Sequence, residues 1–403
     1  MPNTQLQYRV VRTLATAQVL TGIATAGTVA AGSLLVSSIT DSETLAGLAQ
    51  TSSVLGAAAL ALPLARLTSR GGRRLALSVG YLSGVIGSIF AIIGGAHRSL
   101  LFMLLGTFLV GAAHAAGYQA RFAAIDLATN ETSAKQLSFV VWGLTIGAVA
   151  GPNLMDPSGN IAEHFNLPRL VGPYLLSATT LFFATIVIQI FLRPDPYLTA
   201  EKQANVVHHK GSTKAALSHI RSNPKALYSI SAIAIGHLAM VSVMVMTPIH
   251  MKHVDVSLRI IGFVISVHVL GMYAFSPIVG SLSDRLGRIR VIQIGLVILL
   301  ASTIIAGTAA ADNAVQIGIG LFLLGLGWSC TLIAGSALLS ESVSIEMRPA
   351  SQGASDLVMN LSGAGGGALA GIIIGTLSYG WLCFFAAIPV IVLAVNSRKM
   401  SRV

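Results

Sequence analysis

The chain has 403 residues, of which 54% are hydrophobic and only 10% are charged, and its mean hydropathy is +0.78. Because soluble domains carry about 25% charged residues, this composition excludes a water-soluble globular protein and requires lipid as solvent. The net charge of +11 does not indicate nucleic acid, since the basic residues collect in short loops between apolar runs. The cysteines, Cys330 and Cys383, lie far apart in apolar runs, which argues against a disulfide framework or a redox pair.

Residues 1–12 are polar and basic, and the apolar run after them has no convincing cleavage site. We therefore expect a retained first spanning helix rather than a signal peptide. Roughly twelve apolar runs reach the length of about 20 residues that crosses the hydrocarbon core. Their centres fall near Thr25, Leu55, Val85, Leu109, Thr145, Phe182, Ala239, Leu270, Leu300, Leu326, Gly366 and Pro389.

The longest polar stretch separates the sixth run from the seventh and divides the chain into residues 1–192, 193–225 and 226–403. The outer two segments each predict a bundle of six helices, and the middle one predicts a cytoplasmic loop. With both termini in the cytoplasm, the basic residues of short loops lie inside, except Arg98, Arg169, Lys252 and Arg259. The sequence thus predicts an all-α, polytopic membrane protein with twelve transmembrane helices in two pseudo-symmetric bundles.

A short charged loop follows the eighth run and reads Gly280-x-Leu282-Ser283-Asp284-Arg285-x-Gly287-Arg288. It resembles the signature loop of the major facilitator superfamily, whose first copy lies between the second and third spans and whose second copy lies between the eighth and ninth. The first copy begins at Ala65 here, and Ser69 replaces the acidic residue. The resemblance implies a transporter that works by rocking of two halves, with Asp284, Arg285, Gly287 and Arg288 at the gate. A carboxylate that only caps a helix end is the simpler interpretation of Asp284.

Soft side chains recur at a spacing of four in the seventh and eighth spans, as Met240-x-x-x-Met244 and His268-x-x-x-Met272. This spacing puts each pair on one helix face, and thioethers with imidazole favour Cu(I) over harder ions. The pattern resembles the CcoA-like copper importers, and the resemblance implies Met240, Met244, His268 and Met272 as ligands, with His237 or His250 as accessory ligands. Ordinary packing is the alternative for the methionines, but a histidine in mid-span requires a hydrogen bond, a cavity or a ligand.

Two further features allow a different substrate. Gly147-x-x-x-Gly151-Pro152 resembles a motif of proton-coupled drug exporters, although a packing seam beside a helix kink explains it as well. Asp356 is a candidate proton carrier, and pairing with Asn360, Arg121 or Arg348 is the structural alternative.

Arg121 and Asp126 stand close together in sequence at the inner end of the fourth span. We expect them to form an ion pair with each other at the membrane interface.

No zinc-protease, serine-hydrolase or nucleotide-binding motif occurs in the sequence, so we expect neither an enzyme nor a cofactor. The favoured function is a secondary transporter of a small solute in the cytoplasmic (inner) membrane, with copper uptake as the preferred activity. Proton-coupled efflux of small organic molecules or drugs is the first alternative. A non-transporting membrane receptor or scaffold on the same fold is the second. We expect no nucleic-acid partner.

Overall fold

The computed structural model describes residues 4–42, 45, 47–204, 218, 220–252 and 254–400. Most of these described residues lie in helices, and they contain no β-strand. They include eleven segments that are long and apolar enough to span a membrane, and one of them, the 49-residue helix α2 (Leu48–Ala96), is long enough for two crossings. The all-α transmembrane architecture predicted from the sequence is thereby confirmed.

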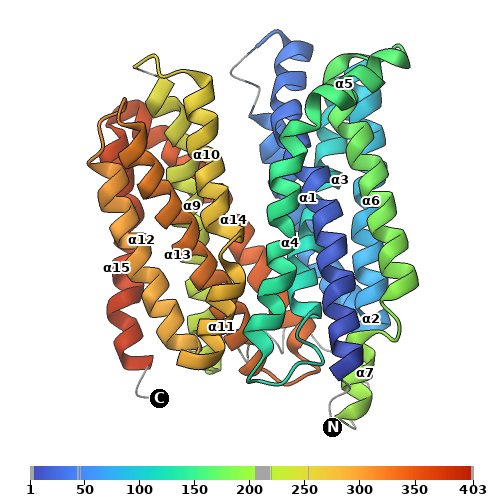
Figure 1. Ribbon diagram of the computed structural model, residues 1–403, viewed down its shortest axis with the longest axis vertical. Helices are drawn as coiled ribbons and strands as arrows, with labels where there is room; N and C mark the ends of the chain where they lie inside the picture. Colours follow the sequence, from blue (N-terminus) through green and yellow to red (C-terminus); the bar gives the residue numbers. More distant parts are fainter. Residues whose placement is uncertain are drawn as a thin grey trace. The chain divides into compact units, whose positions relative to one another are not determined.

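The chain divides into two compact units. The first unit is built mainly from N-terminal helices, whose bounds are α1 (Thr4–Thr40), α2 (Leu48–Ala96), α3 (Leu100–Ala123), α5 (Met155–His164), η2 (Arg169–Val171), α6 (Gly172–Phe191) and α7 (Pro196–Gln203). In Figure 1, α1 runs beside α6, and α2 packs closely along α3. The approach of α2 to α3 depends on glycine, because a Cβ at Gly56 would overlap the Phe108 carbonyl.

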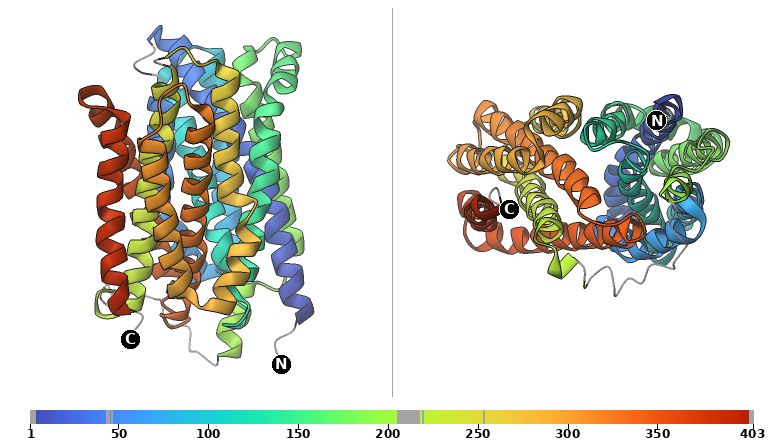
Figure 2. Two further views of the ribbon diagram at one scale, coloured as in Figure 1. Left: turned by 60° about the vertical axis from the view of Figure 1, so that its left-hand side comes forward. Right: turned by 90° about the horizontal axis from the view of Figure 1, so that it is seen from below.

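The second unit is built mainly from C-terminal helices, whose bounds are α9 (Pro224–Lys252), α10 (Leu258–Tyr273), α11 (Ser276–Leu286), α12 (Arg288–Gly307), α13 (Ala314–Glu341) and α15 (Tyr379–Met400). Helix α13 is the central element of this unit, since α9, α10 and α12 all pack against it. Both views of Figure 2 show α9, α12 and α13 side by side.

Two helices are divided between the units. In α4 (Ser133–Asn153) the part up to Trp142 belongs to the second unit, and in α14 (Arg348–Thr376) the part up to Leu357 belongs to the first. Each unit thus takes in the first part of one helix from the other half of the sequence. The predicted division at residues 193–225 stays a prediction, and residues 205–217 and 219 of it lie outside the described part.

The two copies of the signature loop share one backbone feature, a glycine in the left-handed region. Gly72 breaks α2 with φ 83° and ψ 177°, and Gly287 separates α11 from α12 with φ 93° and ψ 150°. Only glycine adopts such φ values without steric cost. The surroundings differ, because a Cβ at Gly72 would stand 2.4 Å from the Asp195 carboxylate, whereas nothing lies within 4 Å of one at Gly287.

This difference predicts an order of stabilities. Gly287→Ala should destabilise the protein by about 1 kcal/mol through backbone strain, and Gly72→Ala by more, because it also displaces Asp195. Gly318→Ala is the matched control, since Gly318 is helical with nothing within 4 Å. Thermal unfolding of the purified variants in detergent measures the order, and equal melting temperatures for all three would contradict it.

Candidate functional site

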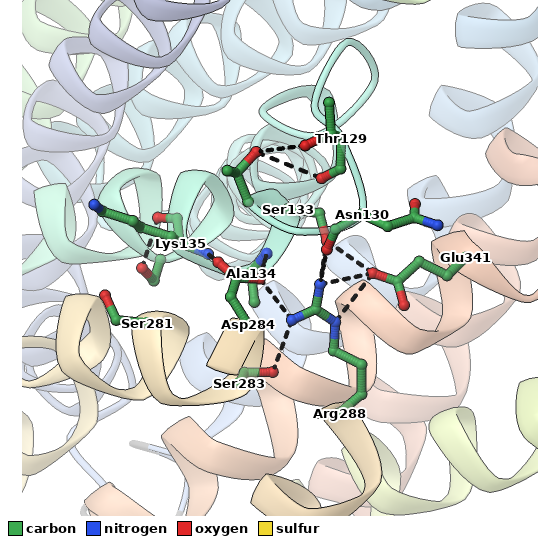
Figure 3. Close-up of polar contacts among 12 residues, drawn as sticks. Thr129, Asn130, Ser133, Ala134, Lys135, Ser281, Ser283, Asp284, Arg288 and Glu341 are labelled. Atoms are coloured by element: carbon green, nitrogen blue, oxygen red, sulfur yellow. Dashed lines mark hydrogen bonds and ion pairs between the residues drawn. The ribbon is translucent and has the colours of Figure 1, made fainter. Parts of the chain in front are cut away.

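The signature loop of the second unit holds the beginning of helix α4. Asp284 accepts hydrogen bonds from the backbone N–H groups of Ala134 and Lys135, at 3.1 and 2.9 Å. These are unsatisfied donors of the first helical turn, and the positive end of the helix dipole favours a carboxylate there. The predicted gating residue Asp284 thus caps a helix, as Figure 3 shows.

Arg288 joins this cap to helix α13. Its guanidinium donates to Asp284 at 2.6 Å, to Glu341 at 2.8 Å and to the Ser133 hydroxyl at 2.9 Å, and it also reaches the Asn130 carbonyl. Arg288 is buried, so these contacts replace the water that the charge has lost. The predicted gating residue Arg285 is instead exposed, with no hydrogen bond or ion pair to any described residue.

The first unit has a matching arginine. Arg73 follows Gly72 as Arg288 follows Gly287, and it donates to both carboxylate oxygens of Asp126, at 2.7 and 3.0 Å. It also donates to the Gln352 side chain on α14 at 2.6 Å. Ser69 stands where the second copy has Asp284, and its hydroxyl bonds the Arg66 carbonyl within its own helix.

The two arginine–carboxylate pairs are equivalent by position. Asp126 lies 53 residues after Arg73, and Glu341 lies 53 residues after Arg288. Glu341 was not predicted from the sequence. Asp126 was predicted, but with Arg121 rather than Arg73 as its partner. This equal spacing within the two repeats was the signal that could have identified both carboxylates.

Arg121 and Asp356 form a second buried ion pair in the first unit, with 2.6 Å between Nη2 and Oδ1 and side chains 2% and 0% exposed. The predicted pairing of Arg121 with Asp126 is therefore wrong, because each residue takes a partner from another helix. Helix α3 ends at Ala123, so Asp126 lies in the turn after it and not on the helix that carries Arg121. The alternative pairing of Asp356 with Arg121 is observed.

Burial alters the acid–base chemistry of Asp126, which lies between two spanning segments. Loss of hydration raises the pKa of its carboxyl, and the charge and hydrogen bonds of Arg73 oppose that shift. Removal of either partner would leave an uncompensated buried charge.

His268 has its imidazole fixed by helix α13. Nδ1 donates to the Leu321 carbonyl at 2.7 Å, since a carbonyl can only accept, and the side chain is fully buried. Nε2 is buried with no hydrogen-bond partner among the described residues. A histidine that binds a metal commonly has this arrangement, in which one nitrogen is held by a carbonyl and the other carries the lone pair.

Trp328 of α13 indicates which residues of α9 and α10 lie at the same depth. It donates to His237 Nδ1 at 3.0 Å and packs edge-on against Tyr273, with 5.8 Å between ring centroids. At a rise of 1.5 Å per residue, Met244 and His268 both lie about 8–10 Å from this level, in the same direction. By this estimate Met244 and His268 lie at similar depths, on helices that both pack on α13.

The remaining predicted ligands occupy different surroundings. Met240 and Met272 are buried, at 3% and 7% exposure, and Met244 is partly buried. His250 stacks on Tyr379 with 4.3 Å between ring centroids. Direct contact between α9 and α10 is slight, and both helices pack on α13 instead.

The glycine motif of α4 lies against α1. A Cβ at Gly147 would meet the backbone of Gly22, and one at Gly151 would meet the Ala26 side chain. The side chain of Pro152 lies outside the described part of the structure.

Comparison with known proteins assigns the family. The sequence matches the model of the Major Facilitator Superfamily over residues 14–258 and 232–399. The chain belongs to the major facilitator superfamily. It is 35% identical to the uncharacterized MFS-type transporter YdeG of Bacillus subtilis, over 96% of this chain and 92% of that protein. It is also 30% identical to the riboflavin transporter RfnT of Brucella anthropi, over 76% of this chain and 74% of that one.

Solved structures agree on the fold. The proton:xylose symporter XylE superposes with a TM-score of 0.74 at 14% identity, covering 98% of this chain and 96% of that one. A bacterial homologue of the iron transporter ferroportin superposes with a TM-score of 0.74 at 13% identity, covering 97% and 99%. This member of the superfamily is therefore a multi-pass membrane protein and a secondary transporter of a small solute.

The ion pairs of the first unit differ in burial, so we expect the loss of a buried pair to lower protein stability more than the loss of an exposed pair. Asp126→Asn should destabilise the superfamily fold by about 3 kcal/mol or more, because it leaves the Arg73 charge buried without its counter-charge. Asp41→Asn should leave the melting temperature unchanged, because the Asp41–Arg98 pair is exposed to solvent. Thermal unfolding of both variants in the same detergent compares them, and equal losses would refute the difference.

Proposed function

We propose that this transporter imports copper ions across the cytoplasmic membrane by alternating access, with both termini in the cytoplasm. The observation that carries the proposal is the buried Nε2 of His268, which lacks a partner among the described residues while Nδ1 is held by Leu321. An unsatisfied polar atom in a helix bundle costs free energy, so its retention favours a ligand.

The methionines supply the preference for copper in this proposal. Thioether sulfur and neutral imidazole are soft, uncharged ligands that suit Cu(I) better than Mg²⁺ or Ca²⁺. Met240, Met244 and Met272 belong to the same unit as His268, and His237 or His250 would complete the set. Copper is here the cargo, so the proposal includes no resident cofactor and no enzymatic reaction.

Asp356 couples this transport to protons in our proposal. Its carboxylate is fully buried and faces Arg121 and Tyr118 from α3 and Arg73 from α2. A proton on Asp356 would remove the negative charge and weaken its bond to Arg121. Helix α14 passes from the first unit to the second directly after Leu357. Loss of the Asp356–Arg121 ion pair would therefore free the beginning of α14 from α3.

Copper uptake by vesicles that contain the purified protein tests the metal site. His268→Asn should reduce uptake by about tenfold or more, because the amide N–H can still donate to Leu321 while the ligand nitrogen is gone. Met244→Leu should act in the same direction. Met359→Leu is the matched control, since Met359 is a buried methionine of α14 outside the proposed site. Full uptake by both site variants would eliminate the metal assignment.

The coupling role of Asp356 predicts a separation of two transport modes. Asp356→Asn should retain copper exchange between equal concentrations at equal pH, because the substrate site is unchanged. It should lose accumulation driven by a pH gradient, because the amide cannot carry a proton. Accumulation at the wild-type level in this variant would show that the proton passes elsewhere.

A small aromatic organic solute is the second candidate substrate. The riboflavin transporter RfnT is similar over three quarters of the chain, and the cluster of His237, Trp328 and Tyr273 offers aromatic faces and a hydrogen-bonding imidazole. The same vesicles distinguish the candidates, since riboflavin uptake without copper uptake would favour the organic solute.

A further inference from the structure

A groove of about 320 Å³ lies along the seam between α1 and α6 of the first unit. It is lined by Tyr8, Arg9, Arg12, Thr13, Thr16, Val187 and Phe191. The residues from α1 recur with helical spacing and occupy one face of that helix. Figure 1 shows the start of α1 beside the end of α6, so the groove lies at one end of the bundle.

The α1 wall of the groove carries two positive charges, Arg9 and Arg12. Arg9 and Arg12 are exposed, and neither forms an ion pair with a described carboxylate. They are three residues apart, a spacing that brings side chains to within about 6 Å of each other on a helix. Arg12 also lies over the Tyr8 ring, 4.9 Å from its centroid, which fixes its guanidinium above an aromatic surface.

The threonine hydroxyl groups of this wall donate to backbone carbonyls of α1 rather than to a bound molecule. Thr13 donates to the Arg9 carbonyl at 2.8 Å, and Thr16 donates to the Arg12 carbonyl at 3.0 Å. Their methyl groups therefore remain for contact with an apolar occupant. The guanidinium groups are the polar part of the wall.

The α6 wall is apolar. Val187 and Phe191 are four residues apart and share one helix face, and the Phe191 side chain is 50% exposed. Tyr8 across the groove is also exposed. Tyrosine with a neighbouring arginine at the end of a spanning helix is typical of the headgroup level of a bilayer. The groove thus joins a cationic headgroup side to an apolar side that continues along the helices.

We propose that this groove binds one anionic phospholipid, with the phosphodiester at Arg9 and Arg12 and an acyl chain along Val187 and Phe191. Basic pockets between spanning helices bind acidic lipid headgroups by this combination of charge and apolar contact. The lipid, rather than free phosphate, is the occupant, because a free anion would leave the apolar wall uncovered. The site is independent of the transported substrate.

Native mass spectrometry of the purified full-length protein tests the site, with equimolar phosphatidylglycerol and phosphatidylcholine added in detergent. Wild type should retain phosphatidylglycerol preferentially. The double variant Arg9→Gln/Arg12→Gln should lose this preference by roughly thirtyfold, since each basic residue near a membrane surface contributes a factor of about five. Both arginines are exposed, so the variant should keep the wild-type melting temperature in phosphatidylcholine.

Two controls make the result specific. Arg98→Gln removes an exposed arginine outside the groove and should leave the lipid preference unchanged. Arg9→Lys/Arg12→Lys keeps the charge and should restore most of it. The proposal is overturned if the double Gln variant keeps the preference, or if Arg98→Gln loses it equally. It is also overturned if glycerol phosphate displaces phosphatidylglycerol at equal concentration, because the apolar wall would then contribute nothing.

Discussion

Each unit depends on one buried arginine that follows a left-handed glycine and binds a carboxylate 53 residues later. The glycine turns the chain sharply between two spanning helices, and the turn directs the arginine back between the helices rather than into water. A buried guanidinium is tolerated only with a charged partner and further acceptors, which Asp126 supplies to Arg73 and Glu341 supplies to Arg288. Because each pair joins residues 53 positions apart in the sequence, the turn, the charge and the helix packing are mutually dependent.

The two units differ in how they hold the first turns of the helix taken from the other half of the sequence, which is α4 in the second unit and α14 in the first. In the second unit Asp284 binds the first N–H groups of α4, which is a contact to backbone that any sequence of α4 would provide. In the first unit the acidic residue is replaced by Ser69, and side chains of α14 take over, with Gln352 bonded to Arg73 and Asp356 bonded to Arg121. Such contacts depend on the charge of one carboxyl, so they respond to protonation in a way that a backbone cap does not.

The sequence was sufficient for the spans, because hydropathy over 20 residues reports the bilayer thickness directly. It was also sufficient for the loop at Gly287, because a positive φ at a charged turn leaves a distinct local pattern. Pairings across helices were different. From the sequence alone, Asp126 and Asp356 are both possible partners of Arg121. In the structure Arg121 pairs with Asp356 of α14, and Asp126 pairs with Arg73. The role of Trp328 was missed for the same reason, since its partners His237 and Tyr273 come from two other helices.

The two central histidines of the second unit differ in which nitrogen carries the proton, and this difference bears on the substrate. His268 donates from Nδ1 to the Leu321 carbonyl, so its neutral ring presents a lone pair at Nε2, which a metal ion requires. His237 accepts at Nδ1 from the Trp328 indole, so its neutral ring carries a proton at Nε2 and acts there as a donor. In the proposed function, the lone pair of His268 suits a soft cation, because a neutral imidazole nitrogen is an uncharged ligand. Nδ1 of His237 already accepts from the Trp328 indole, so of these two nitrogen atoms the proposal relies on Nε2 of His268.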